Sequence, residues 1–245
     1  MALYWLDPEA PPAFPPTHLA LPEPNGLLAV GGDLTPDWLT LAYSHGIFPW
    51  FGEQEPMLWW SPTPRCVFLP GQVHVSRRLR RFIRQRSDLR ITLHRDFEQV
   101  LMACARIERP GQPGTWITEG MQAAYRELHA QGAATAIAVW YGDELAGGLY
   151  GVTLGRVLFG ESMFSARTNG SRIALAAVDW LCRQGRWQLL DAQVESPHLM
   201  RMGATLLLRQ AFEQKLDTWV NEPVVNLPPA GWEFDLHAFL QDIAA

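Results

Sequence analysis

The segments FGESMFS, residues 159–165, and LLDAQV, residues 189–194, decide the fold of this chain and hold its most informative polar groups. Both have the composition of strands. Asp191 and Gln193 stand two residues apart, and side chains at that spacing share one face of a strand. Leu190, Ala192 and Val194 would then face the other way, into a helix-covered layer. A carboxylate beside an amide on an apolar strand is costly to bury unless it is used or satisfied. The pair is therefore a candidate reaction centre, with a satisfied polar pair in a core as the alternative interpretation.

The sequence around these two strands predicts a mixed sheet with helices on its faces. Three strand-like runs separated by hairpin turns precede a long helix, and a strand, a short helix, a strand and a last helix follow. These elements are expected at 134–141, 145–152, 156–164, about 169–184, 189–194 and from Ser196-Pro197 to about 216. The same order is found in N-acyltransferases of the acetyltransferase-like superfamily, in which the strands before and after the central helix splay apart. Glu161, Asp191 and Gln193 would then line one cleft.

The residues before about 65 predict a small subdomain. The first 30 residues are rich in proline and are expected to form an irregular arm, and Thr35, Pro36 and Gly46 mark the start and stop of a short helix. Most rings of an aromatic cluster would form the core here, and its members are Phe48, Trp50, Phe51, Trp59 and Trp60. We therefore expect an α+β protein, with a small N-terminal α/β subdomain over 1–65 and an acetyltransferase-like domain of mixed sheet flanked by helices over 66–245. The residues after about 216 are expected to end in a tail that contains proline and tryptophan.

The composition is that of a globular chain. Apolar residues make up 48% and charged residues 18%, and the net charge of −5 predicts no nucleic-acid binding by itself. The N-terminus has neither a basic segment nor a long apolar run, so we expect no signal peptide and no membrane span. Cys66, Cys104 and Cys182 form an odd set without metal-ligand spacing. We predict free thiols in a reducing compartment, a cytoplasmic location and no metal.

One segment departs from the acidic average. Eight arginines stand between Arg77 and Arg95, against the acids Asp88 and Asp96. The outward positions of the predicted helix are Arg77, Arg78, Arg80, Arg81 and Arg84. A solvated amphipathic face is one interpretation. A local positive field that binds phosphates in a salt-dependent way is the other.

The turn before the long helix, SARTNGS, bears on the cofactor. Coenzyme A acetyltransferases usually place a glycine-rich pyrophosphate loop there, in front of a helix N-terminus. This chain has one glycine in that turn, Gly170. A coenzyme A cofactor is therefore disfavoured but stays open.

Several ordered segments together resemble the leucyl/phenylalanyl-tRNA–protein transferase family, the bacterial aminoacyl transferases of the N-degron pathway. The resemblance covers about residues 23–215. The segments are EPNGLLAVGGDL (23–34), GIFPWF (46–51), LWWSP (58–62), GTWIT (114–118), GGLYGV (147–152), FGESMFS (159–165), LLDAQV (189–194) and HLMRMGA (198–204). It implies transfer of leucine or phenylalanine, and in some cases methionine, from aminoacyl-tRNA to the α-amine of proteins with N-terminal arginine or lysine. It implies no coenzyme A or other cofactor and no metal.

The resemblance also implies roles for residues. Trp50 and Trp116 would contact the 3′-terminal adenosine, and Glu161 would mark the polar end of the site. The aminoacyl pocket would comprise Leu149, Met163, Phe164, Ser165 and Leu175. Leu149 departs from the family pattern, because a relative has methionine there, which leaves the choice of donor open. The arginine helix would bind the tRNA acceptor stem through its backbone and shape.

The family's Asp–Gln pair falls on Asp191 and Gln193. The acceptor α-amine has a reference pKa of about 7.7–8.0, so free amine exists at neutral pH, and positioning should supply much of the rate. Because a neutral amide is a very weak base, we favour Asp191 as the group that holds the α-ammonium and takes up its proton, with Gln193 as orienter. Two other classes of protein stay open: a coenzyme A–dependent acetyltransferase of small amines, and a non-catalytic tRNA-binding protein.

Overall fold

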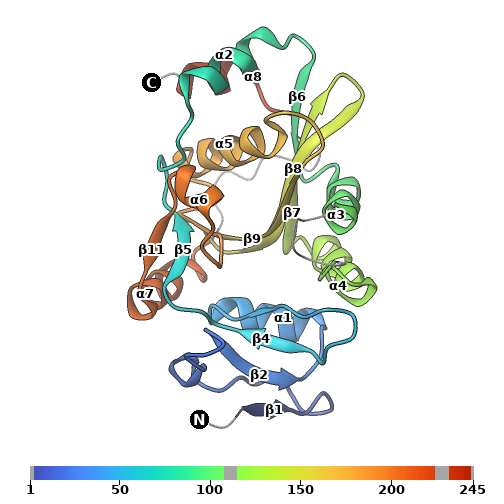
Figure 1. Cartoon of the computed structure of the whole chain (residues 1–245), viewed down its shortest axis with the longest axis vertical. Coiled ribbons are helices and arrows are strands. Elements are labelled where there is room, and N and C mark those ends of the chain that lie inside the picture. The colour runs from blue at the N-terminus through green and yellow to red at the C-terminus, as the bar shows by residue number, and fades with distance from the viewer. Residues whose placement is uncertain (1–2, 108–114, 224–231, 244–245) are drawn as a thin grey trace.

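The computed structural model describes residues 3–107, 115–223 and 232–243. Within these ranges the chain forms two mixed sheets, eight α-helices and one 3-10 helix (Figure 1). This confirms the α+β class. The smaller sheet comes first in the chain and lies below the larger one in the view of Figure 1.

The smaller sheet has the strand order β1-β2-β4-β3. Its strands are β1 (Tyr4–Leu6), β2 (Leu27–Gly31), β3 (Phe48–Pro49) and β4 (Leu58–Trp60), accompanied by the 3-10 helix η1 (Thr17–Leu19) and the helix α1 (Pro36–Ser44). The predicted helix between Thr35 and Gly46 is confirmed as α1. The prediction of an irregular arm over the first 30 residues is wrong at β1 and β2, which pair in parallel. Both strands are short and stand in a proline-rich segment, and each pairs with residues distant in the sequence, so no local pattern predicts them.

The larger sheet has the order β11-β5-β10-β9-β8-β7-β6. Its strands are β5 (Arg65–Phe68), β6 (Leu89–Leu93), β7 (Ala134–Tyr141), β8 (Glu144–Leu154), β9 (Val157–Ser165), β10 (Leu189–Asp191) and β11 (Thr205–Leu207). The predicted meander is confirmed, because β7, β8 and β9 pair antiparallel in chain order. β10 then pairs in parallel with β9 and antiparallel with β5.

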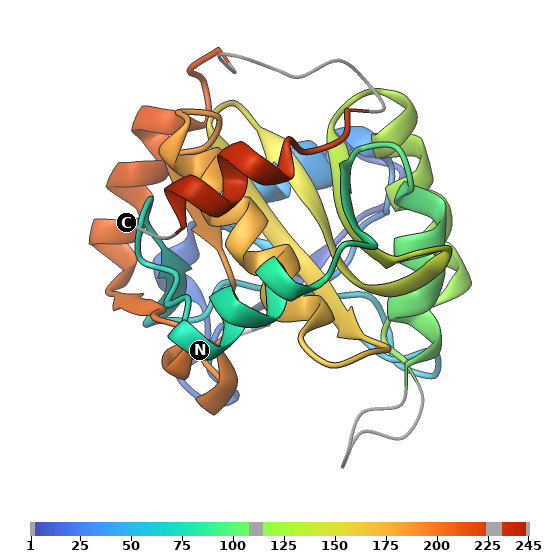
Figure 2. The ribbon, with the colours of Figure 1, turned by 90° about the horizontal axis from the view of Figure 1, so that it is seen from above.

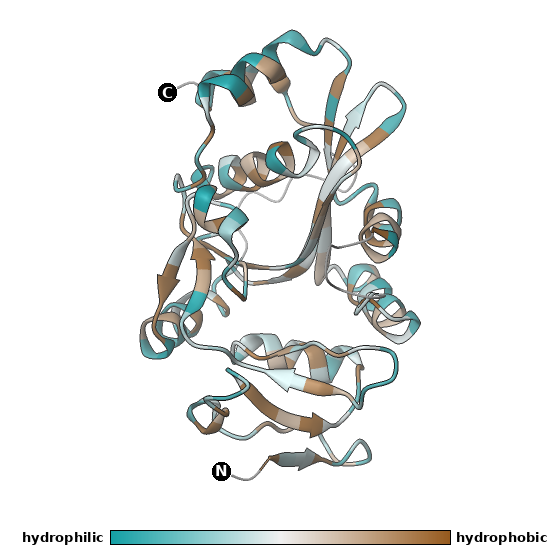
Figure 3. Cartoon of the chain, viewed as in Figure 1, coloured by the Kyte–Doolittle hydropathy of each residue, from teal (hydrophilic) through white to brown (hydrophobic). Residues whose placement is uncertain are grey.

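Helices cover both faces of this sheet. They are α2 (Arg77–Gln85), α3 (Phe97–Arg106), α4 (Glu119–Ala130), α5 (Gly170–Arg183), α6 (Pro197–Arg201), α7 (Arg209–Trp219) and α8 (Leu236–Asp242). One hydrophobic cluster joins the sheet to α1, α3 and α4, and a second joins its other face to α5 and α2. Figure 2 shows α5 and α8 crossing the second face, and Figure 3 shows hydrophilic residues concentrated on α2.

The end of the chain differs from the predicted tail. Residues Leu236–Asp242 form α8, and Phe239 is fully buried. The indole of Trp180, on α5, donates a hydrogen bond to the carboxylate of Asp242 over 2.7 Å and stacks on Trp232. A seven-residue helix is too short to show helical periodicity in the sequence, and its stability comes from this tertiary packing.

Candidate active site

The central feature of the site is the place where β9 and β10 separate. The two strands pair through three residue pairs, the last of which is Phe159 with Asp191. Beyond this point the backbone after β10 stays with β5: the Ala192 N–H donates to the Cys66 carbonyl over 2.9 Å, and the Cys66 N–H donates to the Gln193 carbonyl over 3.1 Å. The segment that starts at Ala192 therefore follows β5 and leaves β9, as the predicted splay requires.

A β-bulge places Glu161 at this separation. Tyr150 faces Ser162 and Gly151 faces Gly160 across the β8–β9 ladder, so Glu161 is the extra residue of β9. Bulges bend a strand and re-aim a side chain, and they are frequent beside active sites. The Glu161 side chain is consequently held at the start of the gap between the two strands.

A cleft of about 1200 Å³ opens at this gap. Seven of the residues expected in the site line it, and they are Trp50, Trp116, Leu149, Glu161, Met163, Leu175 and Gln193. Three do not. Phe164 is buried in the cluster on the opposite face of the sheet, and Asp191 lies fully buried behind the cleft wall. Ser165 is exposed, and its hydroxyl accepts a hydrogen bond from the Ser171 N–H in the first turn of α5 over 2.9 Å.

The expected strand LLDAQV is shorter than predicted. It ends at Asp191, and Gln193 has a left-handed backbone with φ of 62°. Two hydrogen bonds explain this conformation: the Gln193 N–H donates to Asp191 Oδ1 over 2.9 Å, and its amide Nε2 donates to Glu161 Oε1 over 2.8 Å. The two side chains therefore do not point together into the cleft. The Gln193 side chain extends across the gap to Glu161, whereas the buried Asp191 carboxylate accepts a hydrogen bond from the Gln193 N–H.

The partner of Asp191 is Arg65, a residue that our sequence reasoning missed. Arg65 Nε lies 2.9 Å from Oδ1 and Nη2 lies 2.7 Å from Oδ2 of that carboxylate, with both side chains fully buried. Nη1 of Arg65 donates to the Gly46 carbonyl over 2.9 Å. The guanidinium carbon lies 4.7 Å and 4.8 Å from the ring centres of Phe48 and Phe212. An arginine within the apolar strand RCVF was the available signal, because such a charge needs a buried partner.

This pair bears on the role that we expected for Asp191. Both of its carboxylate oxygens accept hydrogen bonds from Arg65 and the Gln193 N–H, and the side chain has no exposed surface. Asp191 is not among the residues that line the cleft, and the hydrogen bond that it accepts from the Gln193 N–H fixes the backbone there.

The Glu161 carboxylate is hydrogen-bonded to Tyr125, and Tyr125 is in turn hydrogen-bonded to Tyr43. The Tyr125 hydroxyl donates to Glu161 Oε2, and the hydroxyls of Tyr43 and Tyr125 lie 2.9 Å apart. Burial raises the pKa of Glu161 to about 7, while the hydrogen bonds from Tyr125 and Tyr43 oppose that rise. The same burial, together with the negative charge of Glu161, holds the pKa of both tyrosines well above the usual value. Near pH 7 both the protonated and the ionised form of this carboxyl group are therefore populated.

The aromatic residues lie at one end of the cleft. Trp50 is 40% exposed, and its carbonyl accepts a hydrogen bond from the indole of Trp60 over 2.7 Å. Trp50 and Trp116 also line an adjoining cavity of about 430 Å³ with Thr115 and Phe51. Two indole rings at the border of two connected hollows provide faces on which a base can stack.

The arginine helix is α2, and its N-cap Ser76 accepts a hydrogen bond from the Leu79 N–H. Arg77, Arg78, Arg81 and Arg84 are exposed as predicted. Arg80 is half-buried, and one of its guanidinium nitrogens lies 3.4 Å from the Ile243 carbonyl. No residue of α2 lines the cleft as the described part of the chain defines it. The helix packs on α8, so its arginines form a surface separate from the cleft.

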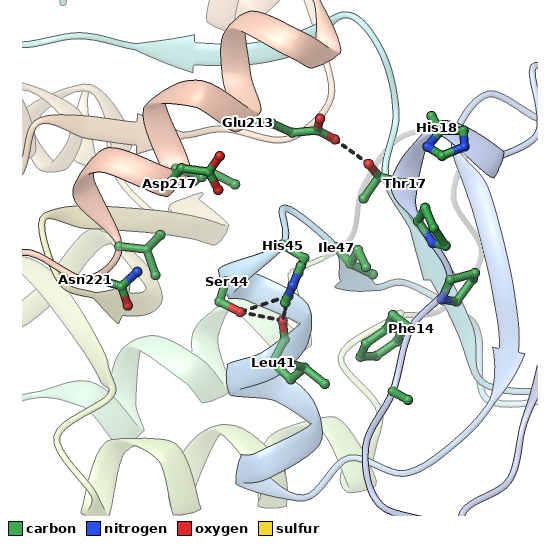
Figure 4. A pocket seen from close by; sticks show the side chains of 15 residues that line it. Phe14, Thr17, His18, Leu41, Ser44, His45, Ile47, Glu213, Asp217 and Asn221 are labelled. Atoms are coloured by element: carbon green, nitrogen blue, oxygen red, sulfur yellow. Dashed lines mark hydrogen bonds between the residues drawn. The ribbon is translucent and has the colours of Figure 1, made fainter.

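A second cavity, of about 690 Å³, lies between the arm at 13–18, the end of α1 and α7 (Figure 4). The Thr17 hydroxyl bonds the Glu213 carboxylate across it, and Nδ1 of His45 lies 2.9 Å from the Leu41 carbonyl. None of the expected site residues lines this cavity.

The described ranges contain no group of three or more His, Cys, Asp or Glu side chains that could hold a metal ion. None of their helices combines the length and the hydropathy that a membrane crossing needs.

Comparison with known proteins identifies the family. The family model described as leucyl/phenylalanyl-tRNA protein transferase matches residues 67–217, and the one described as its N-terminal domain matches 32–63. Proteins named leucyl/phenylalanyl-tRNA–protein transferase align over most of this chain. The one from Xanthomonas campestris pv. campestris (strain 8004) is 52% identical over 92% of this chain and 88% of its own length. The one from Alcanivorax borkumensis is 50% identical, with shares of 94% and 93%, and that from Hydrogenovibrio crunogenus is 47% identical, with 95% and 89%. This chain therefore belongs to the leucyl/phenylalanyl-tRNA–protein transferase family.

Proposed function

We propose that this protein is an aminoacyltransferase that moves leucine or phenylalanine from aminoacyl-tRNA to the α-amine of proteins with N-terminal arginine or lysine, marking them for N-degron degradation. Methionine is a further candidate donor. One observation carries the proposal: the cleft between β9 and β10 joins an apolar pocket to the hydrogen-bonded pair Glu161 and Gln193. An aminoacyl ester and an amine need these two environments side by side.

The apolar part of the cleft suits the donor. Leu149, Met163 and Leu175 line it, and Leu149 and Leu175 are 5% and 1% exposed. A leucine or phenylalanine side chain placed there loses contact with water without leaving a polar group unpaired. Trp50 and Trp116, at the aromatic end, offer faces for the terminal adenosine of the tRNA. Phe164 supports this pocket from the opposite face of β9, and Ser165 supports it through the first turn of α5.

The polar part of the cleft suits the acceptor. In the reaction the α-amine attacks the ester carbonyl carbon, a C–N bond forms, and the bond to the tRNA 3′ oxygen breaks. The amine loses a proton and the tRNA leaves with a hydroxyl group. Gln193 Nε2 donates to Glu161, and within the described ranges no donor binds the amide oxygen of Gln193, so that this oxygen is available to accept a hydrogen bond from the attacking amine.

We assign the proton to Glu161. An ionised carboxylate is a far stronger base than an amide, and a pKa of about 7 lets it accept a proton from the amine and release it later. Asp191 then acts through Gln193, by holding its backbone N–H and by binding Arg65. Catalysis is mainly positional, since the ester is already activated.

Three further expectations belong to the proposal. The order of meander, helix and parallel strand supports an acetyltransferase-like fold for the larger sheet. The family models meet between residues 63 and 67, which supports a boundary near 65 between the parts 1–65 and 66–245. A reaction that consumes charged tRNA supports a cytoplasmic location.

The test mixes the protein with labelled Leu-tRNA and a peptide that begins with arginine. Label should pass into the peptide, and parallel assays with Phe-tRNA and Met-tRNA rank the donors. The control peptide begins with alanine and should receive no label. Binding of charged tRNA without transfer would instead support a non-catalytic tRNA-binding protein, and transfer of acetyl groups from acetyl-coenzyme A would support an acetyltransferase.

A further inference from the structure

We infer that Glu195 recognises the cationic side chain of the acceptor's first residue. This inference rests on the proposed function, because it assigns a residue to a substrate that the function requires. Glu195 lines the cleft two residues after Gln193.

The charges of the cleft single out Glu195. Among the described residues that line it, the charged side chains are Glu161, Glu195 and Arg201. The Glu161 carboxylate accepts hydrogen bonds from Gln193 and Tyr125 and is 7% exposed. Glu195 is exposed, and within the described ranges its carboxylate has no hydrogen bond and no ion pair, Arg201 included. A carboxylate that faces a substrate cleft without a partner is available to a cationic ligand.

The distance from Gln193 to Glu195 fits the length of a lysine or arginine side chain. Gln193 and Glu195 both line the cleft and are two residues apart, so their Cα atoms lie at most about 7 Å from each other. The α-amine bound at Gln193 would have its own side chain extending along the wall formed by residues 193–195. The stems of lysine and arginine, with four and three methylene groups, cover a similar distance before the charged head.

The backbone holds Glu195 at a defined place. The Gln193 carbonyl is bound by the Cys66 N–H of β5, and Ser196 is the N-cap of α6, with its hydroxyl accepting from the Leu199 N–H over 3.2 Å. Glu195 stands between these two anchored residues. The negative charges of Asp191 and Glu195 add to burial in raising the pKa of Cys66 to about 12, which is consistent with a carboxylate close to β5.

The test compares Glu195→Gln with the wild type on peptides that differ in the first residue alone. At saturating Leu-tRNA, the variant should raise KM about tenfold for peptides that begin with arginine or lysine, as expected when a charge-assisted hydrogen bond becomes a neutral one. A peptide that begins with citrulline, the neutral analogue of arginine, should show the same KM with both proteins. The kcat and the KM for Leu-tRNA should not change.

Two more variants sharpen the result. Glu195→Lys places a like charge opposite the acceptor and should raise KM further for arginine and lysine, with no such effect for citrulline. Glu127→Gln, an equal charge change at an exposed position of α4, is the matched control and should behave as wild type. An unchanged KM in Glu195→Gln, or an equal rise for citrulline, would overturn the inference. Failure of the proposed function would look different, since the wild type would then transfer no amino acid to any peptide.

Discussion

The guanidinium of Arg65 and the carboxylate of Asp191 form a two-point ion pair that joins β5 to β10 beneath the cleft. Arg65 also binds the Gly46 carbonyl just after α1, and Asp191 also binds the N–H of Gln193. One buried pair thus connects the end of α1, the centre of the larger sheet and Gln193 in the wall of the cleft.

The Arg65→Ala variant should lose stability because it leaves the Asp191 carboxylate buried without a counter-charge. Breaking a buried pair from one side costs about 3–5 kcal/mol. Urea denaturation should show this loss in the free energy of unfolding. The matched control is Arg126→Ala, whose pair with Glu98 is about half exposed and should contribute about 0–1 kcal/mol. Equal losses in the two variants would mean that the buried pair has no special weight.

The pH dependence of transfer should reveal Glu161. Because its carboxyl group must be ionised to accept a proton and its pKa is about 7, kcat/KM for the acceptor peptide should rise as the pH increases through 7. The acceptor amine adds a second rise near its own pKa of about 7.7–8.0. Glu161→Gln should keep the second rise, lose the first and react at least about a hundredfold more slowly.

The Tyr125→Phe variant keeps the Glu161 carboxyl group and changes its pKa. The Tyr125 hydroxyl stabilises the ionised form of Glu161, so its removal should raise the pKa and move the first rise to higher pH. A pH profile identical to that of the wild type in both variants would exclude Glu161 as the proton acceptor.

The same shift predicts how stability depends on pH. Glu161 has a pKa of about 7 in the folded protein and about 4.5 when unfolded, so the folded state holds more protons between these values. The free energy of unfolding should therefore fall by on the order of 3 kcal/mol as the pH rises from 4.5 to 7. Urea denaturation at each pH should show that the free energy of unfolding declines less for Glu161→Gln than for the wild type over that window. Parallel declines would contradict the raised pKa.

The sequence predicted the meander and the splayed pair because these depend on local signals. Gly142 and Gly155 have positive φ values at the hairpin turns, and strand alternation is visible on either side of them. The bulge at Glu161 and the left-handed turn at Gln193 were not predictable. Each depends on contacts with other strands. The bulge depends on how β9 pairs with β8, and the turn depends on the bond from Gln193 to Glu161 and on the Arg65 pair that holds Asp191. The helix α8 was missed for the same reason, since Trp180 stabilises it from α5.

Seven of the ten residues expected in the site line the cleft, whereas the orientation of Asp191 and its pairing with Arg65 were not predicted. Spacing alone placed Asp191 and Gln193 on one face, which assumed that the strand continued beyond Asp191. The strand stops where β10 loses its partner β9, and only the structure shows that Gln193, and not Asp191, lines the cleft. Arg65 illustrates the limit most clearly, because its partner lies 126 positions away.

The exposed arginines of α2 should bind tRNA through its phosphates. We expect Arg78→Glu combined with Arg81→Glu to weaken binding of charged tRNA and to reduce the salt dependence of log Kd by about one unit of slope per lost phosphate contact. Filter binding at several salt concentrations measures both quantities. Arg126→Glu, on α4, is the control for a general charge effect. An unchanged Kd and slope in the α2 variant would remove this helix from the interface.

Leu149 should influence which amino acid the protein accepts. It lines the cleft and is 5% exposed, so its shape is felt by any side chain bound there. Leu149→Met replaces a stiff branched group by a flexible one of similar volume and should cost less than about 1.5 kcal/mol of stability. We expect the flexible side chain to admit methionine better, and the ratio of Met-tRNA to Leu-tRNA use in a mixed-donor assay should rise about threefold or more, since a single methylene in an apolar pocket is worth tenfold or more. Leu158→Met is the control, because Leu158 is fully buried in the same hydrophobic cluster but lies outside the cleft. If both variants changed the ratio equally, the effect would come from loosened packing and not from the shape of the donor pocket.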